Sequence, residues 1–326
     1  MSTHFPDEVF QEFTVLSIPT LTNFRGINHR EVALFRGSEG WSEFAPFLEY
    51  EVAEAAHWLK ASVRAAYKPW PKLYRESIEV NAIIPNIDAA RVPELLAKFR
   101  GCTTVKIKVN AFEDGAALVE AVLQVIPDAK IRLDVNGGWS LRDAIEYLYE
   151  YHSRFGDIFE YIEQPCKDLF DLRQLKRETP FKIAADESIR KGLDNSFSEL
   201  SEFADIAMLK WAPVGGFEVA HEIISSAGLP VVVSSALDTG IGIAHGAALA
   251  ASFPKMDFAC GLGTIALLES DICEPALLPE NGAIAVERRE PSERLMAKYA
   301  ASEERRNWWK NRVTDIWNAN RGEEWL

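Results

Sequence analysis

The run TVKIKV at residues 104–109 predicts a β-strand, because β-branched residues surround its two lysines. Side chains alternate between the two faces of a strand, so Lys106 and Lys108, two residues apart, point to the same side. If the strand lies in a buried sheet, two like charges enter one small space. The rest of the sequence has to explain why a protein tolerates that arrangement.

This strand is one of eight short apolar runs between residues 80 and 261, each followed by a helix-like segment. We take one residue near the end of each run as a marker: Asn81, Lys106, Asp134, Glu163, Asp186, Lys210, Ser235 and Gly261. Successive markers are 25, 28, 29, 23, 24, 25 and 26 residues apart. A strand, a crossover helix and two loops need this many residues, and parallel strands require such crossovers. Eight repeats predict an α/β fold with a (β/α) barrel of the modified TIM type at residues 78–280, rather than an open doubly wound sheet.

The sequence on either side of the barrel follows another pattern. In residues 1–77, REVALFRG and GWSEF read as two strands joined by a GSEG turn, and residues 49–67 have helical periodicity. Residues 281–326 are charged and aromatic, with Trp308, Trp309 and Trp317 in the last part. We expect an α+β capping domain formed by the N-terminal segment, with the C-terminal tail packed on the cap or the barrel.

Composition excludes several classes of partner. The 326 residues carry a formal net charge of −14, which argues against a nucleic-acid ligand because phosphate binding needs a basic face. A local cationic pocket can still bind a small carboxylate. The N-terminal residues lack the pattern of a signal peptide, and no run is long enough to span a bilayer. We therefore expect a soluble cytoplasmic protein, for which a monomer is plausible, with buried thiols at Cys102, Cys166, Cys260 and Cys273.

Three carboxylates follow three successive strands of the predicted barrel. Because barrel enzymes place their chemistry at the carboxyl ends of the strands, we expect Asp134, Glu163 and Asp186 to converge there. A single aspartate at a strand end is more often a helix N-cap, but three in register are not explained that way. Without a cation they would repel one another. Their oxygen ligands predict one hard divalent cation, Mg²⁺, for which Mn²⁺ can substitute.

The lysines suggest what such a site does. A lysine acts as a general base only when it is neutral, and a neighbouring lysine or metal ion disfavours the protonated form. Lys210 ends the apolar run IAMLK and could by itself extend to solvent, but in register with the acids it reads as a cation on the opposite wall. This set favours removal of a proton from a carbon beside a carboxylate, which generates an enediolate.

Hydroxyls and glycines follow the last two runs. In SSALDTGIGIAHG and CGLGT we expect Ser234, Ser235, Gly261 and Gly263 to bind a substrate carboxylate. A dinucleotide fingerprint is the weaker reading, because GIG matches only part of it and lies far from the start of a βαβ unit. No histidine of the chain has metal-ligand spacing.

With these residues in place, the chain resembles the enolase superfamily in its muconate lactonizing enzyme-like branch, and more narrowly a short form of the o-succinylbenzoate synthase family. The segments that carry the resemblance lie between residues 24 and 268 and are FRG, GWSEFAPF, KIKV, LDVNGGW, YIEQPC, AADESI, LKWAPVGG, VVVSSALDTGIG and CGLGTIALL. The resemblance implies an Mg²⁺-dependent lyase that dehydrates 2-succinyl-6-hydroxy-2,4-cyclohexadiene-1-carboxylate to 2-succinylbenzoate in menaquinone biosynthesis.

The resemblance also implies roles for single residues. Lys108 would be the base, Lys106 would assist at the substrate carboxylate, and Lys210 would stabilise the enediolate by a cation–π contact from the opposite face. Asp134, Glu163 and Asp186 would bind Mg²⁺. Arg25, in the capping segment TLTNFRG, and the EFAPF segment would help select the succinyl side chain.

The sequence departs from the family pattern at Trp211, where we expect altered packing, and at Gly240, where relatives commonly have a serine. Two other functions stay open at this point. An N-acylamino acid racemase or dipeptide epimerase would use Lys108 and Lys210 for proton exchange on two faces. A non-catalytic binding protein on a barrel scaffold is disfavoured, because a binder has no use for a buried lysine pair.

Overall fold

The computed structural model describes residues 5–24, 26–191, 197–320 and 325. The N-terminal part is a three-stranded antiparallel sheet in the order β1-β2-β3, packed against helix α1. Its elements are β1 (Gln11–Phe24), β2 (Ile27–Gly37), β3 (Gly40–Phe44) and α1 (Val52–Tyr67). The predicted strand pair and helix of this region are confirmed, while the longer first strand escaped the sequence analysis.

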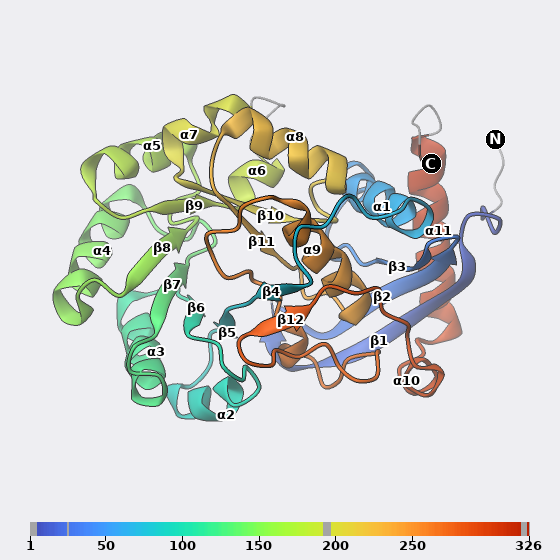
Figure 1. The fold of residues 1–326 in the computed structure, drawn as a ribbon, viewed down its shortest axis with the longest axis horizontal. Helices are drawn as coiled ribbons and strands as arrows, with labels where there is room; N and C mark the ends of the chain where they lie inside the picture. Colours follow the sequence, from blue (N-terminus) through green and yellow to red (C-terminus); the bar gives the residue numbers. More distant parts are fainter. Residues whose placement is uncertain (1–4, 25, 192–196, 321–324, 326) are drawn as a thin grey trace.

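The C-terminal helices return to this sheet. They are α10 (Glu293–Lys298) and α11 (Glu303–Ala319). Trp309 of α11 is fully buried, and its Nε1 donates to Glu31 Oε2 of β2 over 2.8 Å. Arg305 Nη2 lies 2.6 Å from the same oxygen, so a partly buried ion pair joins helix and sheet. Figure 1 shows α11 in red beside the blue strands.

The second part is a parallel sheet of seven strands in sequential order, from β5 to β11. Its strands are β5 (Ala82–Ile84), β6 (Thr104–Lys108), β7 (Lys130–Asp134), β8 (Phe159–Glu163), β9 (Ile183–Ala185), β10 (Ile206–Lys210) and β11 (Val231–Ser234). The intervening α-helices are α2 (Val92–Leu96), α3 (Phe112–Val125), α4 (Leu141–Phe155), α5 (Leu169–Glu178), α6 (Glu187–Lys191), α7 (Leu200–Phe203), α8 (Phe217–Ala227) and α9 (Gly240–Ser252). Short 3₁₀ turns lie at Ala89–Arg91, Phe197–Glu199 and Thr264–Leu267.

The expected eighth strand is not a regular strand, yet it closes the ring. Cys260 forms a parallel bridge with Val80, and Gly261 forms one with Ser234. On one side Asn81 N donates to Cys260 O over 2.9 Å, and on the other Gly261 N donates to Val233 O over 2.8 Å. Two residues therefore connect both edges of the seven-stranded sheet, and the predicted barrel architecture is confirmed.

Asn81 shows one error of the sequence analysis. It precedes β5 instead of ending it, so it lies toward the amino ends of the strands, away from the other marker residues. Its side-chain amide donates to Ala82 O and accepts from Arg132 Nη1, both at 2.9 Å. The Asn81 side chain therefore makes its hydrogen bonds inside the barrel wall and does not reach the carboxyl ends of the strands.

Helix α9 lies between barrel and capping sheet and contacts β3, β4 (Ser77–Glu79) and β11. All thirteen of its residues are buried, which explains its glycine- and alanine-rich composition. Among the described residues no helix has the length and apolar character needed to cross a bilayer. Trp211 packs on His245 of this helix with ring centroids 4.8 Å apart, so it faces the helices as expected.

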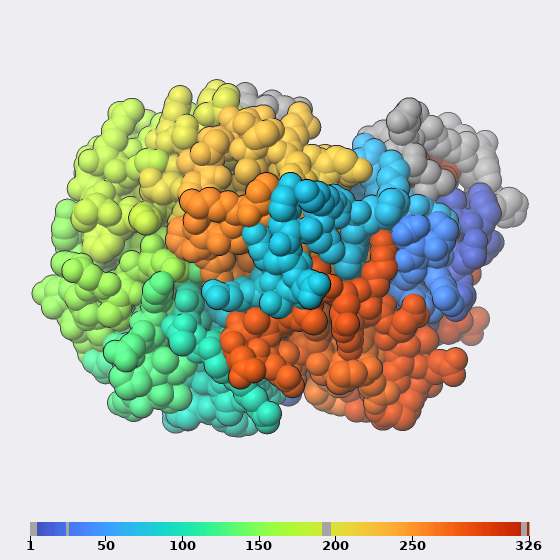
Figure 2. All heavy atoms as spheres, in the orientation of Figure 1, coloured from blue at the N-terminus to red at the C-terminus, as the bar shows by residue number. Residues whose placement is uncertain are grey.

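The chain between cap and barrel runs over the outside of α9. Tyr74 N donates to Ala251 O over 2.8 Å, and Val286 N donates to Glu76 O over 2.9 Å. Strand β4 also pairs with β12 (Ala283–Ala285), an antiparallel ribbon that the sequence analysis missed. Figure 2 shows this linking segment in cyan beside the orange C-terminal segment. The cap is thus held to the barrel from both ends of the chain.

Candidate active site

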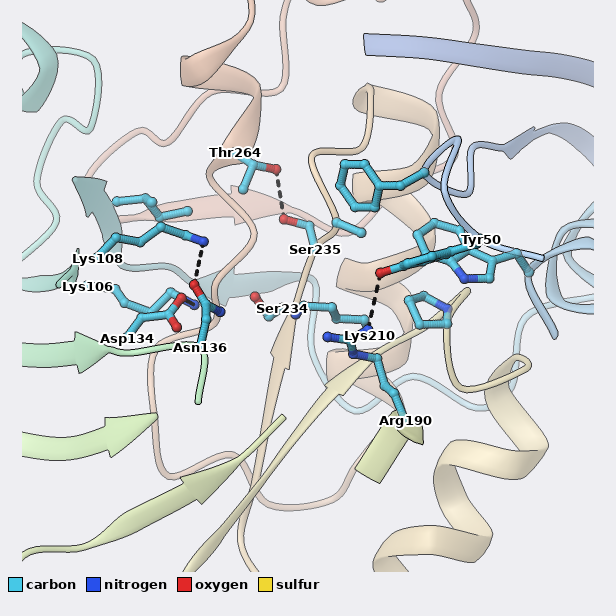
Figure 3. A pocket seen from close by; sticks show the side chains of 15 residues that line it. Tyr50, Lys106, Lys108, Asp134, Asn136, Arg190, Lys210, Ser234, Ser235 and Thr264 are labelled. Carbon is cyan, nitrogen blue, oxygen red and sulfur yellow. Dashed lines mark hydrogen bonds and ion pairs between the residues drawn. The ribbon is translucent and has the colours of Figure 1, made fainter. Parts of the chain in front are cut away.

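A pocket of about 550 Å³ opens where the strand ends of the barrel meet the cap. One side carries charged groups from the strand ends and the other carries apolar cap residues (Figure 3). The lining residues are Phe47, Tyr50, Trp58, Ile83, Lys106, Lys108, Asp134, Asn136, Arg190, Lys210, Pro213, Ser234, Ser235, Ala236 and Thr264.

Strand register brings the predicted residues together. Lys108 lies beside Asp134 in the pairing of β6 with β7, and Asp134 lies beside Glu163 in the pairing of β7 with β8. Asp186 directly follows β9, and Lys210 is paired with Ser234 across β10 and β11. Parallel pairing therefore aligns all of these side chains at one end of the barrel, as the spacing of the sequence predicts.

Lys106 is buried between two of the carboxylates. Its Nζ lies 2.9 Å from Glu163 Oε2 and 3.2 Å from Asp134 Oδ2, and the residue is 6% exposed. Burial alone would lower the pKa of Lys106, but Asp134 and Glu163 raise it above the ordinary lysine value. Lys106 is therefore held as an ammonium, which suits a fixed positive charge and does not suit a base.

Lys108 points elsewhere. Its Nζ donates to Asn136 Oδ1 over 2.8 Å, and Asn136 Nδ2 in turn donates to Glu187 Oε1 over 3.2 Å. Figure 3 shows the Lys108 amine reaching toward Asn136 on the pocket side. The two lysines of the opening run thus donate to different groups, while Asp134 interacts electrostatically with both of them. The carboxylates beside them offset the two like charges.

Asp186 and Lys210 form the opposite wall. Lys210 Nζ lies 2.5 Å from Asp186 Oδ2, and Arg190 Nε donates to Asp186 Oδ1 over 3.1 Å. Burial would raise the pKa of Asp186, but Arg190 and Lys210 hold it well below its usual range. Since β6 and β10 are four positions apart in the strand order of a closed ring, Lys108 and Lys210 face each other across the pocket.

The three carboxylates fit a divalent cation by their chemistry. Burial and the nearby Asp134 raise the pKa of Glu163 to about 7, so the trio is short of positive charge even with Lys106 beside it. Among the described residues, Asp134 Oδ1 is a buried oxygen without a hydrogen-bond partner. In the described ranges no three acidic, histidine or cysteine side chains are gathered closely enough to hold a metal ion as they stand. Lys106 bonds to Asp134, and Lys210 bonds to Asp186. The oxygen donors suit Mg²⁺.

The residues predicted to bind substrate separate into two groups. Ser234 and Ser235 line the pocket, and Ser235 Oγ lies 2.7 Å from Thr264 Oγ1. Gly261 and Gly263 are not among the lining residues, and their role in binding substrate stays a prediction. A Cβ on Gly261 would lie 2.5 Å from Ser234 Oγ and one on Gly263 would lie 2.8 Å from Phe99, so close packing requires both glycines. Arg25 lies outside the described residues.

The sequence analysis missed several lining residues. Asn136 follows Asp134 by two positions and Arg190 follows Asp186 by one helical turn, so both could have been found from the spacing of the acids. The cap residues Tyr50 and Trp58 carry no such signal. Gly240, whose serine-to-glycine departure we noted, donates its N–H to Asp271 Oδ1 over 2.8 Å and does not line the pocket.

Comparison with known proteins agrees with this architecture. Residues 89–291 match the family described as Enolase C-terminal domain-like, and residues 15–66 match Enolase N-terminal domain-like. Muconate lactonizing enzyme from Pseudomonas putida superposes with a TM-score of 0.72 at 20% identity, covering 89% of this chain and 98% of that one. The Pseudomonas fluorescens enzyme complexed with muconolactone gives 0.74 at 18% identity, with 89% and 98% covered. These likenesses show the fold.

Sequence relatives are closer. The o-succinylbenzoate synthase of Mycolicibacterium smegmatis is 43% identical over 94% of this chain and 95% of its own length. The Mycobacterium tuberculosis protein of the same name is 42% identical over 92% and 91%. The Mycobacterium ulcerans protein is 41% identical over 94% and 93%. This chain therefore belongs to the enolase superfamily, within the family that contains these o-succinylbenzoate synthases.

Proposed function

We propose that this chain is an o-succinylbenzoate synthase, a lyase that converts 2-succinyl-6-hydroxy-2,4-cyclohexadiene-1-carboxylate to 2-succinylbenzoate on the way to menaquinone. One observation carries the proposal: relatives of that name are 41–43% identical over more than nine-tenths of both chains. The chemistry of the pocket supports it. We expect the partner of this protein to be a small carboxylate and its location to be the cytoplasm.

In the proposed reaction, Lys108 Nζ removes the proton from ring carbon C1, beside the carboxylate. The electron pair passes into the carboxylate as an enediolate and returns to form the C1–C6 double bond as the C6 hydroxyl leaves. Lys108 then carries the proton that converts the departing hydroxide to water. The ring becomes aromatic, and the sum of the two steps is loss of one water.

The other amines serve as fixed charges. Lys106, which pairs with Asp134 and Glu163 in this structure, would turn toward the substrate carboxylate from the same wall as Lys108. Lys210 faces the ring from the opposite wall and offsets the negative charge of the enediolate. A positioned base contributes about 10²–10⁴-fold, whereas enzymes commonly reach at least about 10⁶-fold. Electrostatic stabilisation of the enediolate must therefore supply a large share.

Asp134, Glu163 and Asp186 would hold one divalent cation, Mg²⁺ in our proposal, for which Mn²⁺ can substitute. When bound, such an ion supplies positive charge for the oxygens of the enediolate. The buried positions of the three carboxylates at adjacent strand ends support this assignment.

The proposal is tested by following the aromatic product in the ultraviolet, with the cyclohexadiene substrate and Mg²⁺. We expect turnover far above the rate without protein. Absence of the aromatic product, with folded protein and Mg²⁺ present, would contradict the assignment.

A second candidate, N-acylamino acid racemase or dipeptide epimerase, is favoured by one observation: Lys108 and Lys210 line the pocket from opposing strands. Two bases on two faces are what a racemase needs. Incubation with N-succinyl amino acids and with dipeptides in D₂O separates the candidates. Deuterium uptake faster than formation of 2-succinylbenzoate would favour this second function.

A further inference from the structure

A buried arginine of the cap bonds to the barrel loop that lines the pocket. Arg30 of β2 is 2% exposed, and its guanidinium donates to three backbone carbonyls. One is Ala45 O of the cap; the others are Leu237 O, at 3.1 Å from Nε, and Ala236 O, at 3.1 Å from Nη2. The guanidinium carbon also lies 4.4 Å from the ring centroid of Phe47. Arg30 therefore touches pocket-lining segments of both parts of the molecule.

The barrel segment that Arg30 holds is a strained turn. Leu237 has a φ of +63°, which an L residue other than asparagine, aspartate or glycine rarely adopts. Such a conformation is unfavourable and persists only where surrounding contacts impose it. Here the contacts come from Arg30 and from Glu43, whose Oε2 accepts from Thr239 N over 3.1 Å. Both residues belong to the cap, so the cap imposes the shape of the turn.

This turn forms part of the pocket wall. Ala236 from the turn and Phe47 from the cap both line the pocket, whereas Arg30 itself does not. The two side chains are apolar, so they face an apolar part of a ligand and not its carboxylates. The guanidinium fixes both at once: Nη2 donates to Ala45 O of the cap and Ala236 O of the barrel, and Nε donates to Leu237 O. A lysine lacks the rigid planar fork that holds these three bonds in one fixed geometry.

We propose that Arg30 is a positioning residue that sets substrate specificity: it fixes the separation of Phe47 and Ala236 and so the room for the methylene segment of the substrate's side chain. The inference rests on the proposed function for the identity of that side chain, the succinyl group, whose two methylene groups lie between a ketone and a carboxylate. Arg30 acts through its neighbours and does not contact the reacting atoms.

The chain offers a matched control. Arg75 also donates to three barrel carbonyls, those of Ala250, Phe253 and Pro254, at 2.8–3.1 Å, but none of these residues lines the pocket. Arg75→Lys therefore loses a comparable set of hydrogen bonds without touching the wall. A merely structural role would make the two variants behave alike.

The experiment compares Arg30→Lys with Arg75→Lys in the full-length protein with Mg²⁺. We expect Arg30→Lys to raise KM for the cyclohexadiene substrate about tenfold or more, the size of effect that a misfit of one methylene group has in an apolar pocket, with kcat within threefold. Its Kd for 2-succinylbenzoate should rise in parallel, while its Kd for benzoate, which lacks the succinyl chain, stays within twofold of wild type. Arg75→Lys should leave all three constants within twofold.

An unchanged KM in folded Arg30→Lys, or an equal rise in Arg75→Lys, would overturn the inference. If circular dichroism shows that Arg30→Lys does not fold, Phe47→Leu tests the same wall of the pocket. An unchanged KM in Phe47→Leu would also overturn the inference. Absence of wild-type turnover would instead sink the proposed function, so the two failures are distinguishable.

Discussion

Two buried polar clusters lie close together in this molecule and are built differently. The strand-end cluster consists of Lys106, Asp134, Glu163, Asp186 and Lys210, and its side chains pair with one another. The seam cluster consists of Arg30, Glu43, Asp238 and Thr239, between cap and barrel, and most of its hydrogen bonds go to backbone groups.

The difference indicates what each cluster is for. Ion pairs between side chains can be exchanged for a ligand without disturbing the chain, and Asp134 Oδ1 has no hydrogen-bond partner within the described residues. Bonds to backbone carbonyls and amides fix the chain itself. We therefore expect changes in the strand-end cluster and its neighbour Lys108 to act on turnover and metal binding, and changes in the seam cluster to act on stability and substrate fit.

The largest effect is expected for Lys108→Ala. Turnover should fall by at least about 10²–10⁴-fold, because the proposed base is removed while the buried pairs of Lys106 and Lys210 remain. Initial rates of aromatic product formation measure this, and circular dichroism checks the fold. Lys130→Ala, at the exposed start of β7, is the control and should leave the rate unchanged. Near-normal turnover in Lys108→Ala would remove the assigned base.

Asp134→Asn should weaken Mg²⁺ binding about 10–100-fold, because it replaces a charged oxygen ligand with a neutral one. Calorimetric titration of Mg²⁺ measures this without relying on turnover. Asp128→Asn, at an exposed position before β7, should bind as wild type. In the wild-type protein EDTA should abolish activity and added Mg²⁺ should restore it. Activity that persists in chelator would contradict the metal assignment.

In the seam cluster, Thr239→Ala should lower the free energy of unfolding by about 0.5–2 kcal/mol. Thr239 Oγ1 accepts from Ile241 N at the start of α9 and donates to Glu43, both away from water. Urea unfolding measures the change, and kcat should stay within threefold. Ser140→Ala, the exposed N-cap of α4, should cost less because water can replace the hydroxyl. A loss of turnover without a loss of stability in Thr239→Ala would remove the distinction between the clusters.

The smallest effect concerns pH. His245 of α9 accepts from Trp70 Nε1 over 3.0 Å, and burial lowers its pKa from 6.5 to about 3. The folded state keeps His245 neutral, so stability is complete above pH 6.5 and falls as the unfolded chain takes up a proton below it. His245→Gln should reduce the decline between pH 6.5 and 5.5 by about 1 kcal/mol. Thermal melts across this range test it, and an unchanged slope would contradict the assignment.

The difference between the strand-end cluster and the seam cluster also explains which residues could be predicted from the sequence. The period of 23–29 residues located the acids and lysines because the strands from β6 to β10 each carry a polar residue at or just after the carboxyl end; Asn81 before β5 is the exception. Asn136 and Arg190 could have been found by the same reasoning, since both line the pocket and follow the predicted residues Asp134 and Asp186 by two and four positions.

The seam cluster could not have been predicted from the sequence. Arg30 and Leu237 are separated by 207 residues, and the carbonyl that joins them belongs to no side-chain motif. The predicted eighth strand is shorter than expected. Only two residues, Cys260 and Gly261, close the ring, and their backbone groups pair with the two edges of the sheet. The close packing at Gly261 and Gly263 could not be predicted, because a glycine needed for packing looks the same in sequence as one that admits a ligand.

The most direct test of the account is anomalous diffraction from crystals of the protein soaked with Mn²⁺. We predict one strong peak about 2.0–2.2 Å from oxygens of Asp134, Glu163 and Asp186, with the amines of Lys106 and Lys210 moved off those oxygens. No peak at this position, or amines that stay bonded to the three carboxylates at saturating Mn²⁺, would contradict it.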